Sequence, residues 1–246
     1  MVEHIKNKIS DLVDEYYKKE EDNSSFKKIV PTLIKKGLEN VNLSMFSEER
    51  KKELLEAVGD EFLRRDQKTD ALKMYAKVSN TTKINEVAKE FAKVGLYTYA
   101  IDAYKLSDNK EMLLKVGNKC LEEGHINEAI KAFEAIKNTE RLKTVGDYCL
   151  EKLKLEYALE VFKFLNDKQK LIETGDKCIK ENELSIAAQS FEAANDKIKL
   201  NELGDLLLKK GMLNGALRAY EQSENIMMVE FIKENFKGDP KIGTYL

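Results

Sequence analysis

The chain has 246 residues, of which 35% are charged and only two are proline, and its formal net charge is −2 with a pI near 6.0. This composition favours helices over sheets, and the near-neutral charge excludes a strong overall attraction to nucleic acid or to an anionic membrane. The sequence contains no run of 18 apolar residues, and its first residues lack the apolar core of a signal peptide, so we expect a cytoplasmic protein.

Residues 1–57 are predicted to form a helical cap for the rest of the chain. Apolar residues recur every three or four positions in residues 2–20 and again in residues 26–38, where Pro31 marks a helix start or a kink. Gly37 and Phe46 lie 29 residues before equivalent residues of the next segment, which leaves a degenerate repeat as the alternative. Ser47 is the predicted N-cap of the following helix.

Residues 58–231 repeat one pattern of 29 residues six times without a gap. We number the positions of the repeat from its first residue. The six copies begin at Val58, Val87, Val116, Val145, Thr174 and Leu203. Position 14 is always alanine, and position 18 is always aromatic: Tyr75, Tyr104, Phe133, Phe162, Phe191 and Tyr220. A fixed period of this length indicates stacked helical units that bury their apolar faces against one another.

Two positions predict where the helices of each repeat begin and end. Position 23 is always Asn or Asp, which can accept a hydrogen bond from the first turn, so we expect a helix to begin directly after it. Position 9 holds Gly or Asn in four copies, at Gly95, Gly124, Asn182 and Gly211, and these residues tolerate the left-handed backbone that ends a helix. A second helix then carries the alanine and the ring, which we expect to fill the space between units.

The spacing of Gly117, Gly124, Ala129 and Phe133 resembles the tetratricopeptide repeat. The resemblance implies an all-α, right-handed solenoid of about six helical hairpins over residues 58–231, with residues 232–246 as the end of the last helix and a tail. It also implies a concave face, lined mainly by the first helices, that holds a peptide or a partner helix. The period of 29 is shorter than the typical 34, and the closing proline is missing, so the groove geometry should carry over only in outline.

The first helices carry the candidate partner-binding residues at positions 3 and 7. These candidates are Asp60, Asn118, Asp147, Glu151, Asp176 and Asp205. An acidic row of this kind would favour a basic partner segment. The alternative is a solvated face, in which Asp60 pairs with Arg64, Asp176 with Lys180 and Asp205 with Lys209 along their own helices.

The sequence offers little for catalysis or metal binding. His4 and His125 are the only histidines, and no glycine-rich phosphate-binding motif is present. Cys120, Cys149 and Cys178 all occupy position 5, which favours small buried side chains over disulfides or a zinc site. We therefore expect no enzyme activity, no cofactor and no metal.

The predicted function is that of a non-catalytic scaffold or adaptor for protein partners. A helical-repeat RNA reader is the alternative, but the acidic position 3 disfavours it. Self-association is a further alternative, because Ile226, Met227, Met228 and Val229 form an apolar cluster in the last helix. That cluster would either bind a second copy or be covered by the tail.

Overall fold

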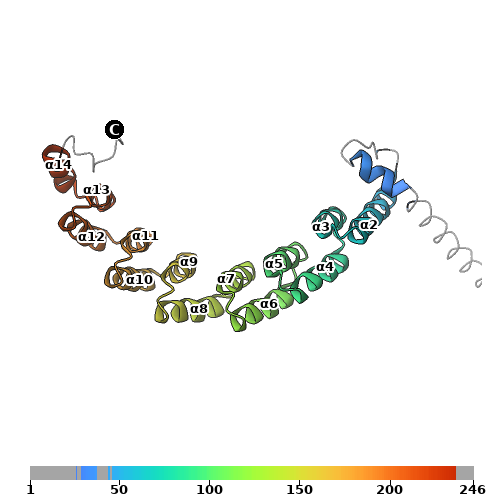
Figure 1. The fold of residues 1–246 in the computed structure, drawn as a ribbon, viewed down its shortest axis with the longest axis horizontal. Helices are drawn as coiled ribbons and strands as arrows, with labels where there is room; N and C mark the ends of the chain where they lie inside the picture. The colour runs from blue at the N-terminus through green and yellow to red at the C-terminus, as the bar shows by residue number, and fades with distance from the viewer. Residues whose placement is uncertain (1–25, 27–28, 38–43, 45, 237–246) are drawn as a thin grey trace, which may run out of the picture. The chain divides into compact units, whose positions relative to one another are not determined.

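The computed structural model describes residues 26, 29–37, 44 and 46–236, and these residues form helices joined by short turns, with no strand (Figure 1). The helix expected in residues 2–20 and the tail after residue 236 lie outside the described part. The labelled helices are α2 (Glu48–Arg64), α3 (Lys68–Lys77), α4 (Thr81–Lys93), α5 (Tyr97–Leu106), α6 (Lys110–Glu122), α7 (Ile126–Ala135), α8 (Thr139–Glu151), α9 (Leu155–Leu165), α10 (Lys168–Lys180), α11 (Leu184–Ala194), α12 (Lys197–Lys209), α13 (Leu213–Gln222) and α14 (Ile226–Asn235).

Neighbouring helices pack in pairs, as the repeat predicts. The pairs are α2 with α3, α4 with α5, α8 with α9, α10 with α11, and α12 with α13. The chain divides into two compact units, one ending at Val116 and the other beginning at Gly117. None of the described helices combines the length and apolar character that a bilayer span requires.

The predicted helix starts at position 23 are confirmed in all six copies. Each Asn or Asp side chain accepts a hydrogen bond from the backbone N–H three residues later, at 3.0 to 3.2 Å. The capping residues are Asn80, Asn109, Asn138, Asp167, Asp196 and Asn225. Ser47 caps α2 in the same way, accepting from the N–H of Arg50 at 3.3 Å.

Left-handed residues end both helices of each repeat. Position 9 has a φ between 56° and 83° in all six copies, including Asp66 and Leu153, where no glycine or asparagine is present. Position 22 also has a positive φ in every copy, at Ser79, Asp108, Lys137, Asn166, Asn195 and Glu224. Because these turns are tight, only two or three residues separate consecutive helices from α2 to α14, which accounts for the short period.

The position-18 ring is buried in every repeat, and in the five repeats with glycine at position 2 it lies against that glycine. A Cβ atom on Gly59 or Gly204 would lie 2.6 or 2.7 Å from the ring of Tyr75 or Tyr220. The ring therefore lies inside its own hairpin, rather than in the space between units that the sequence suggested. The position-14 alanines are fully buried beside it: Ala71, Ala100, Ala129, Ala158, Ala187 and Ala216.

The described N-terminal residues pack onto the first full repeat. Phe26 and Val30 are buried in one cluster with Leu54, Val58 and Met74. Residues 29–36 are helical, and so is Phe26, so Pro31 lies within a helical segment. These residues therefore cover apolar side chains of α2 and α3.

Candidate partner-binding surface

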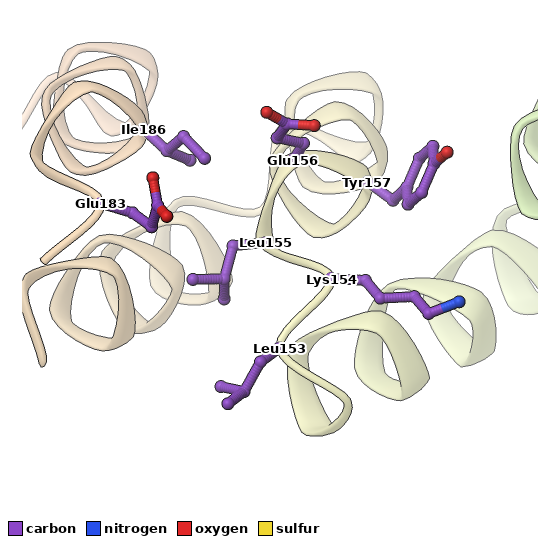
Figure 2. Close-up of a pocket in the computed structure, with 7 residues that line it drawn as sticks. All are labelled: Leu153, Lys154, Leu155, Glu156, Tyr157, Glu183 and Ile186. Carbon is purple, nitrogen blue, oxygen red and sulfur yellow. The ribbon is translucent and has the colours of Figure 1, made fainter. Parts of the chain in front are cut away.

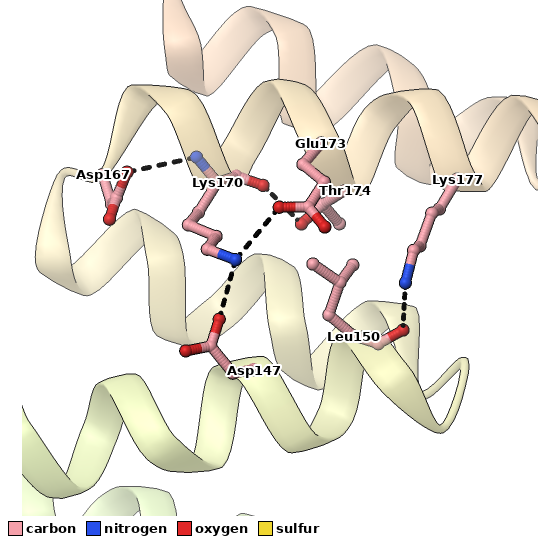
Figure 3. Close-up of polar contacts among 7 residues, drawn as sticks. All are labelled: Asp147, Leu150, Asp167, Lys170, Glu173, Thr174 and Lys177. Atoms are coloured by element: carbon pink, nitrogen blue, oxygen red, sulfur yellow. Dashed lines mark hydrogen bonds and ion pairs between the residues drawn. The ribbon is translucent and has the colours of Figure 1, made fainter.

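Three position-3 aspartates form ion pairs with a lysine of the next first helix. Asp147 lies 2.9 Å from Lys170 Nζ (Figure 3), Asp176 lies 3.0 Å from Lys199 Nζ, and Asp60 lies 3.3 Å from Lys83 Nζ. Each lysine occupies position 26 and also approaches a glutamate on its own helix: Glu86, Glu173 or Glu202. We call these three sets the Asp–Lys–Glu ladder.

The ladder joins consecutive repeats through ion pairs and also forms an acidic surface. Hydrogen bonds to Asp147, and then to Glu173, raise the pKa of Lys170, and Asp176 and Glu202 act in the same way on Lys199. The lysines therefore stay charged, and each set of two carboxylates and one ammonium carries one net negative charge. The aspartates are only partly available to a partner, because each already forms an ion pair with a lysine of the next first helix.

The sequence offered pairing along single helices, such as Asp60 with Arg64, as an alternative, but in the structure Arg64 pairs with Glu61. Arg64 donates to Glu61 at 2.7 Å, and hydrogen bonds from Arg64 and Arg65 lower the pKa of Glu61 to about 2. Asp60 instead forms an ion pair with Lys83 of the next first helix and accepts a hydrogen bond from Tyr75 of its own hairpin.

Two of the position-18 tyrosines donate a hydrogen bond to the aspartate at position 3 of the same repeat. Tyr75 donates to Asp60 and Tyr220 donates to Asp205, both at 2.7 Å. In the repeat of Asp205, position 26 is Met228 rather than lysine. The hydrogen bond from Tyr220 therefore partly replaces the ion pair that a lysine would make with Asp205. In the second repeat position 3 is Lys89, and the Tyr104 hydroxyl is buried without a hydrogen-bond partner among the described residues.

The remaining candidates, Asn118 and Glu151, lie on α6 and α8. Asn118 is half-buried, and Glu151 is exposed at the end of α8 with its carboxylate 3.3 Å from Lys152 Nζ. Neither joins the ladder. The predicted acidic row is therefore interrupted in the second and third repeats, where position 3 is Lys89 and Asn118.

In the second unit the helices form two rows. Figure 1 shows α8, α10 and α12 along one side and α7, α9, α11 and α13 on the inner side of the bend. Within this row α9 contacts both α7 and α11. The tetratricopeptide resemblance implied the first helices on the inner side, whereas this unit places the second helices there. The small alanine at position 14 lets the second helices of neighbouring repeats lie close together. The longer Asp–Lys pairs lie between the first helices.

The apolar cluster of the last helix is largely exposed. Ile226 and Met227 are 67% and 73% exposed, and Phe231, which the sequence analysis missed, is 45% exposed. These residues occupy positions 24, 25 and 29, which hold polar residues in the five earlier copies apart from Ile198. Met228 and Val229 are half-buried. Of the described residues of α14, only Ile232 is buried.

The cysteines are packing residues, as predicted. Cys120, Cys149 and Cys178 are free thiols with no exposed surface. Burial raises the pKa of Cys120 to about 12 and those of Cys149 and Cys178 to about 11. At neutral pH the thiols are therefore protonated and poor nucleophiles.

A pocket that the sequence analysis missed lies between the fourth and fifth hairpins (Figure 2). It has a volume of about 270 Å³. Its lining residues are Leu153, Lys154, Leu155, Glu156, Tyr157, Glu183 and Ile186. The sequence contains one indication of this pocket: Leu153 occupies position 9, where every other copy has Gly, Asn or Asp.

Within the described part of the chain, no group of three or more His, Cys, Asp or Glu side chains is arranged to hold a metal ion. No family model and no curated protein matches the sequence.

Proposed function

We propose that this protein is a non-catalytic cytoplasmic scaffold or adaptor that binds a peptide or helix of a protein partner. In this proposal the hairpins continue as a right-handed solenoid. The observation that carries the proposal is the Asp–Lys–Glu ladder, which fixes consecutive repeats and leaves excess negative charge on their surface. A surface held in place before binding loses less conformational entropy when a partner docks.

Other bonds between repeats support the same argument. Lys177 Nζ donates to the carbonyl oxygen of Leu150 at 3.1 Å, joining α10 to the end of α8 (Figure 3). Asn225 donates to Asn201 at 2.6 Å, joining α14 to α12. Polar contacts of this kind contribute modestly to stability one by one, but together they set the spacing of neighbouring hairpins.

The preferred partner segment is basic. Each ladder set has a net charge of −1, and Asp147 and Asp176 keep about two fifths of their side-chain surface exposed. Complementary charge mainly raises the association rate and the specificity of such a complex. Glu173 and Glu202 supply the excess charge, since Lys170 and Lys199 already neutralise the aspartates.

The test is affinity capture from the source cell followed by binding measurements with the purified partner. The informative variant is Glu173→Gln with Glu202→Gln, which lowers the charge but keeps the Asp–Lys clamps. Glu181→Gln with Glu192→Gln, at exposed sites outside the ladder, is the matched control. We expect a stoichiometric protein with a basic segment, whose affinity falls with added salt and in the ladder variant alone. Salt-sensitive retention of RNA without such a protein would favour the RNA-reader alternative.

A self-associating structural role is the second candidate, and α14 favours it. Three positions that are polar in earlier first helices, apart from Ile198, carry Ile226, Met227 and Phe231 here. A second copy would offer the same apolar face, and a two-fold contact would cover both faces at once.

The self-association test is sedimentation of the wild type beside the variant Met227→Glu with Phe231→Glu. Glutamate is the residue that the array itself has at these positions, in Glu111 and Glu86, so the variant should fold. A concentration-dependent dimer in the wild type and a monomer in the variant would support this role. A wild type that is monomeric at all concentrations would exclude it.

A further inference from the structure

The pocket between the fourth and fifth hairpins has the size of one side chain. It is formed by the α8–α9 loop, the first turn of α9 and the start of α11, all within the second unit. Its volume of about 270 Å³ is below the usual range for small-molecule sites, which begins at roughly 300 Å³. Leu155 is buried, while Leu153 and Ile186 keep part of their surface exposed, so the pocket offers apolar walls.

Two exposed carboxylates border these apolar walls. Glu156 comes from α9 and Glu183 from the residue before α11. In Figure 2 Glu183 and Ile186 face Leu155, whereas Lys154 and Tyr157 extend away from them. Among the residues that the structure describes, no cation lies within ion-pair distance of either glutamate. The ladder aspartates differ in this respect, because Lys170 and Lys199 already bind Asp147 and Asp176.

Leu153 is the only apolar side chain at position 9 among the six copies. Its φ is 56°, a left-handed conformation that leucine adopts at a cost, and glycine occupies the same position at Gly95, Gly124 and Gly211. The side chain is also 49% exposed, so its burial does not offset that cost. Strained residues that persist without a stabilising role are often functional. A role in lining the pocket accounts for a large apolar residue here.

We propose that this pocket binds one arginine side chain of the partner protein. The alkyl part of the arginine lies on Leu153, Leu155 and Ile186, and the guanidinium binds Glu156 and Glu183. Arginine fits better than lysine, because its five N–H donors can reach carboxylates from two directions and its head group is weakly hydrated. The inference rests on the proposed scaffold function and specifies how a basic partner segment is anchored.

The test is an NMR titration of the full-length, isotope-labelled protein with the peptide acetyl-Ala-Ala-Arg-Ala-Ala-amide. Matched peptides carry lysine or citrulline in place of arginine, and citrulline keeps the shape but lacks the charge. We expect saturable shifts at residues 153–157 and 183–186, with at least tenfold weaker binding of the citrulline peptide. Equal binding of arginine and citrulline, or shifts elsewhere only, would overturn the proposal. Tighter binding of lysine than of arginine would overturn the choice of arginine.

Three variants separate the pocket from general effects on the fold. Glu156→Gln with Glu183→Gln should abolish the shifts, whereas Glu192→Gln, at the other end of α11, should leave them unchanged. Leu153→Gly should fold at least as well as the wild type but bind the peptide several-fold more weakly. Unchanged peptide binding in both pocket variants would contradict the assignment.

The pocket and the scaffold function can fail separately. If a protein partner is captured but the peptide produces no shifts, the scaffold proposal stands and the arginine pocket is wrong. If the arginine peptide binds as expected but no protein partner is found, the pocket stands and the scaffold proposal fails.

Discussion

Position 2 and the ring at position 18 lie in close contact in the five hairpins that have glycine at position 2. In the sixth repeat, a Cβ atom on Gly204 would lie 2.7 Å from Cε1 of Tyr220, whereas one on Gly215 would make an ordinary contact with Leu207 at 3.4 Å. We expect Gly204→Ala to lower the free energy of unfolding by about 1–3 kcal/mol, because the ring must move. Gly215→Ala should instead be neutral or stabilise α13 by up to about 1 kcal/mol. Urea denaturation of both variants checks this, and equal midpoints would refute it.

The buried thiols predict a loss of stability at alkaline pH. Their pKa values in the folded protein are about 12 for Cys120 and about 11 for Cys149 and Cys178, against about 8.5 when unfolded. Below pH 8.5 both states hold these protons. Above it the unfolded state releases them first, so the free energy of unfolding falls as pH rises toward 11.

The size of the alkaline effect can be measured against a cysteine-free variant. Three thiols that ionise only in the unfolded state lower the free energy of unfolding by at most about 4 kcal/mol per pH unit. Urea denaturation at pH 7.5, 9 and 10 should show a much steeper fall for the wild type than for Cys120→Ala, Cys149→Ala, Cys178→Ala. The variant should start less stable, because it leaves cavities. Parallel pH profiles would show that the thiols titrate normally.

At the scale of the helix, the tyrosine hydroxyls tie the two helices of a hairpin together in some repeats and not in others. Tyr220 on α13 donates to Asp205 on α12, while the Tyr104 hydroxyl is buried without a partner in the described structure. Tyr220→Phe should cost roughly 1 kcal/mol of stability, and Tyr104→Phe should be neutral or stabilising, because it removes an unsatisfied buried group. Thermal unfolding of the two variants compares the same chemical change in two settings. A larger loss for Tyr104→Phe would refute the assignment.

The elements show which features a single sequence can predict. The helix starts were predictable because each cap joins residues only three apart, as Asn138 and Arg141 do. The left-handed turns at position 22 were missed, since Ser79, Lys137 and Glu224 give no glycine signal. There the chain accepts a strained residue because the helices on both sides fix the turn.

The candidate site was harder to predict because it depends on distances between helices. Asp147 and Lys170 are 23 residues apart, and their pairing follows from the spacing of α8 and α10 rather than from a pattern along either helix. The pocket likewise requires Leu155 and Glu183 to meet across two hairpins. A stacked-repeat model with defined spacing would have been needed to predict either feature.

At the scale of the whole molecule, a stacked array should tolerate the removal of one complete period. Deleting residues 146–174 removes 29 residues and joins Val145 at position 1 to Gly175 at position 2. Every later residue keeps its position in the repeat, so Gly175 still faces Phe191 and Asp176 still reaches Lys199. We expect a folded, cooperative protein with a smaller denaturant m-value, because less surface is exposed on unfolding.

The control for this deletion removes fewer residues but breaks the register. Deleting residues 146–171 joins Val145 to Ile172 and shifts the remaining positions by three, which turns the buried face of the hybrid helix away from its partner. Circular dichroism and urea denaturation should show native-like helicity for the 29-residue deletion and a loss of cooperative unfolding for the shorter one. If the shorter deletion were as stable as the longer one, stability would not depend on the 29-residue register. The same full-period deletion removes Leu153, Leu155 and Glu156, so a correctly folded product should also fail to bind the arginine peptide.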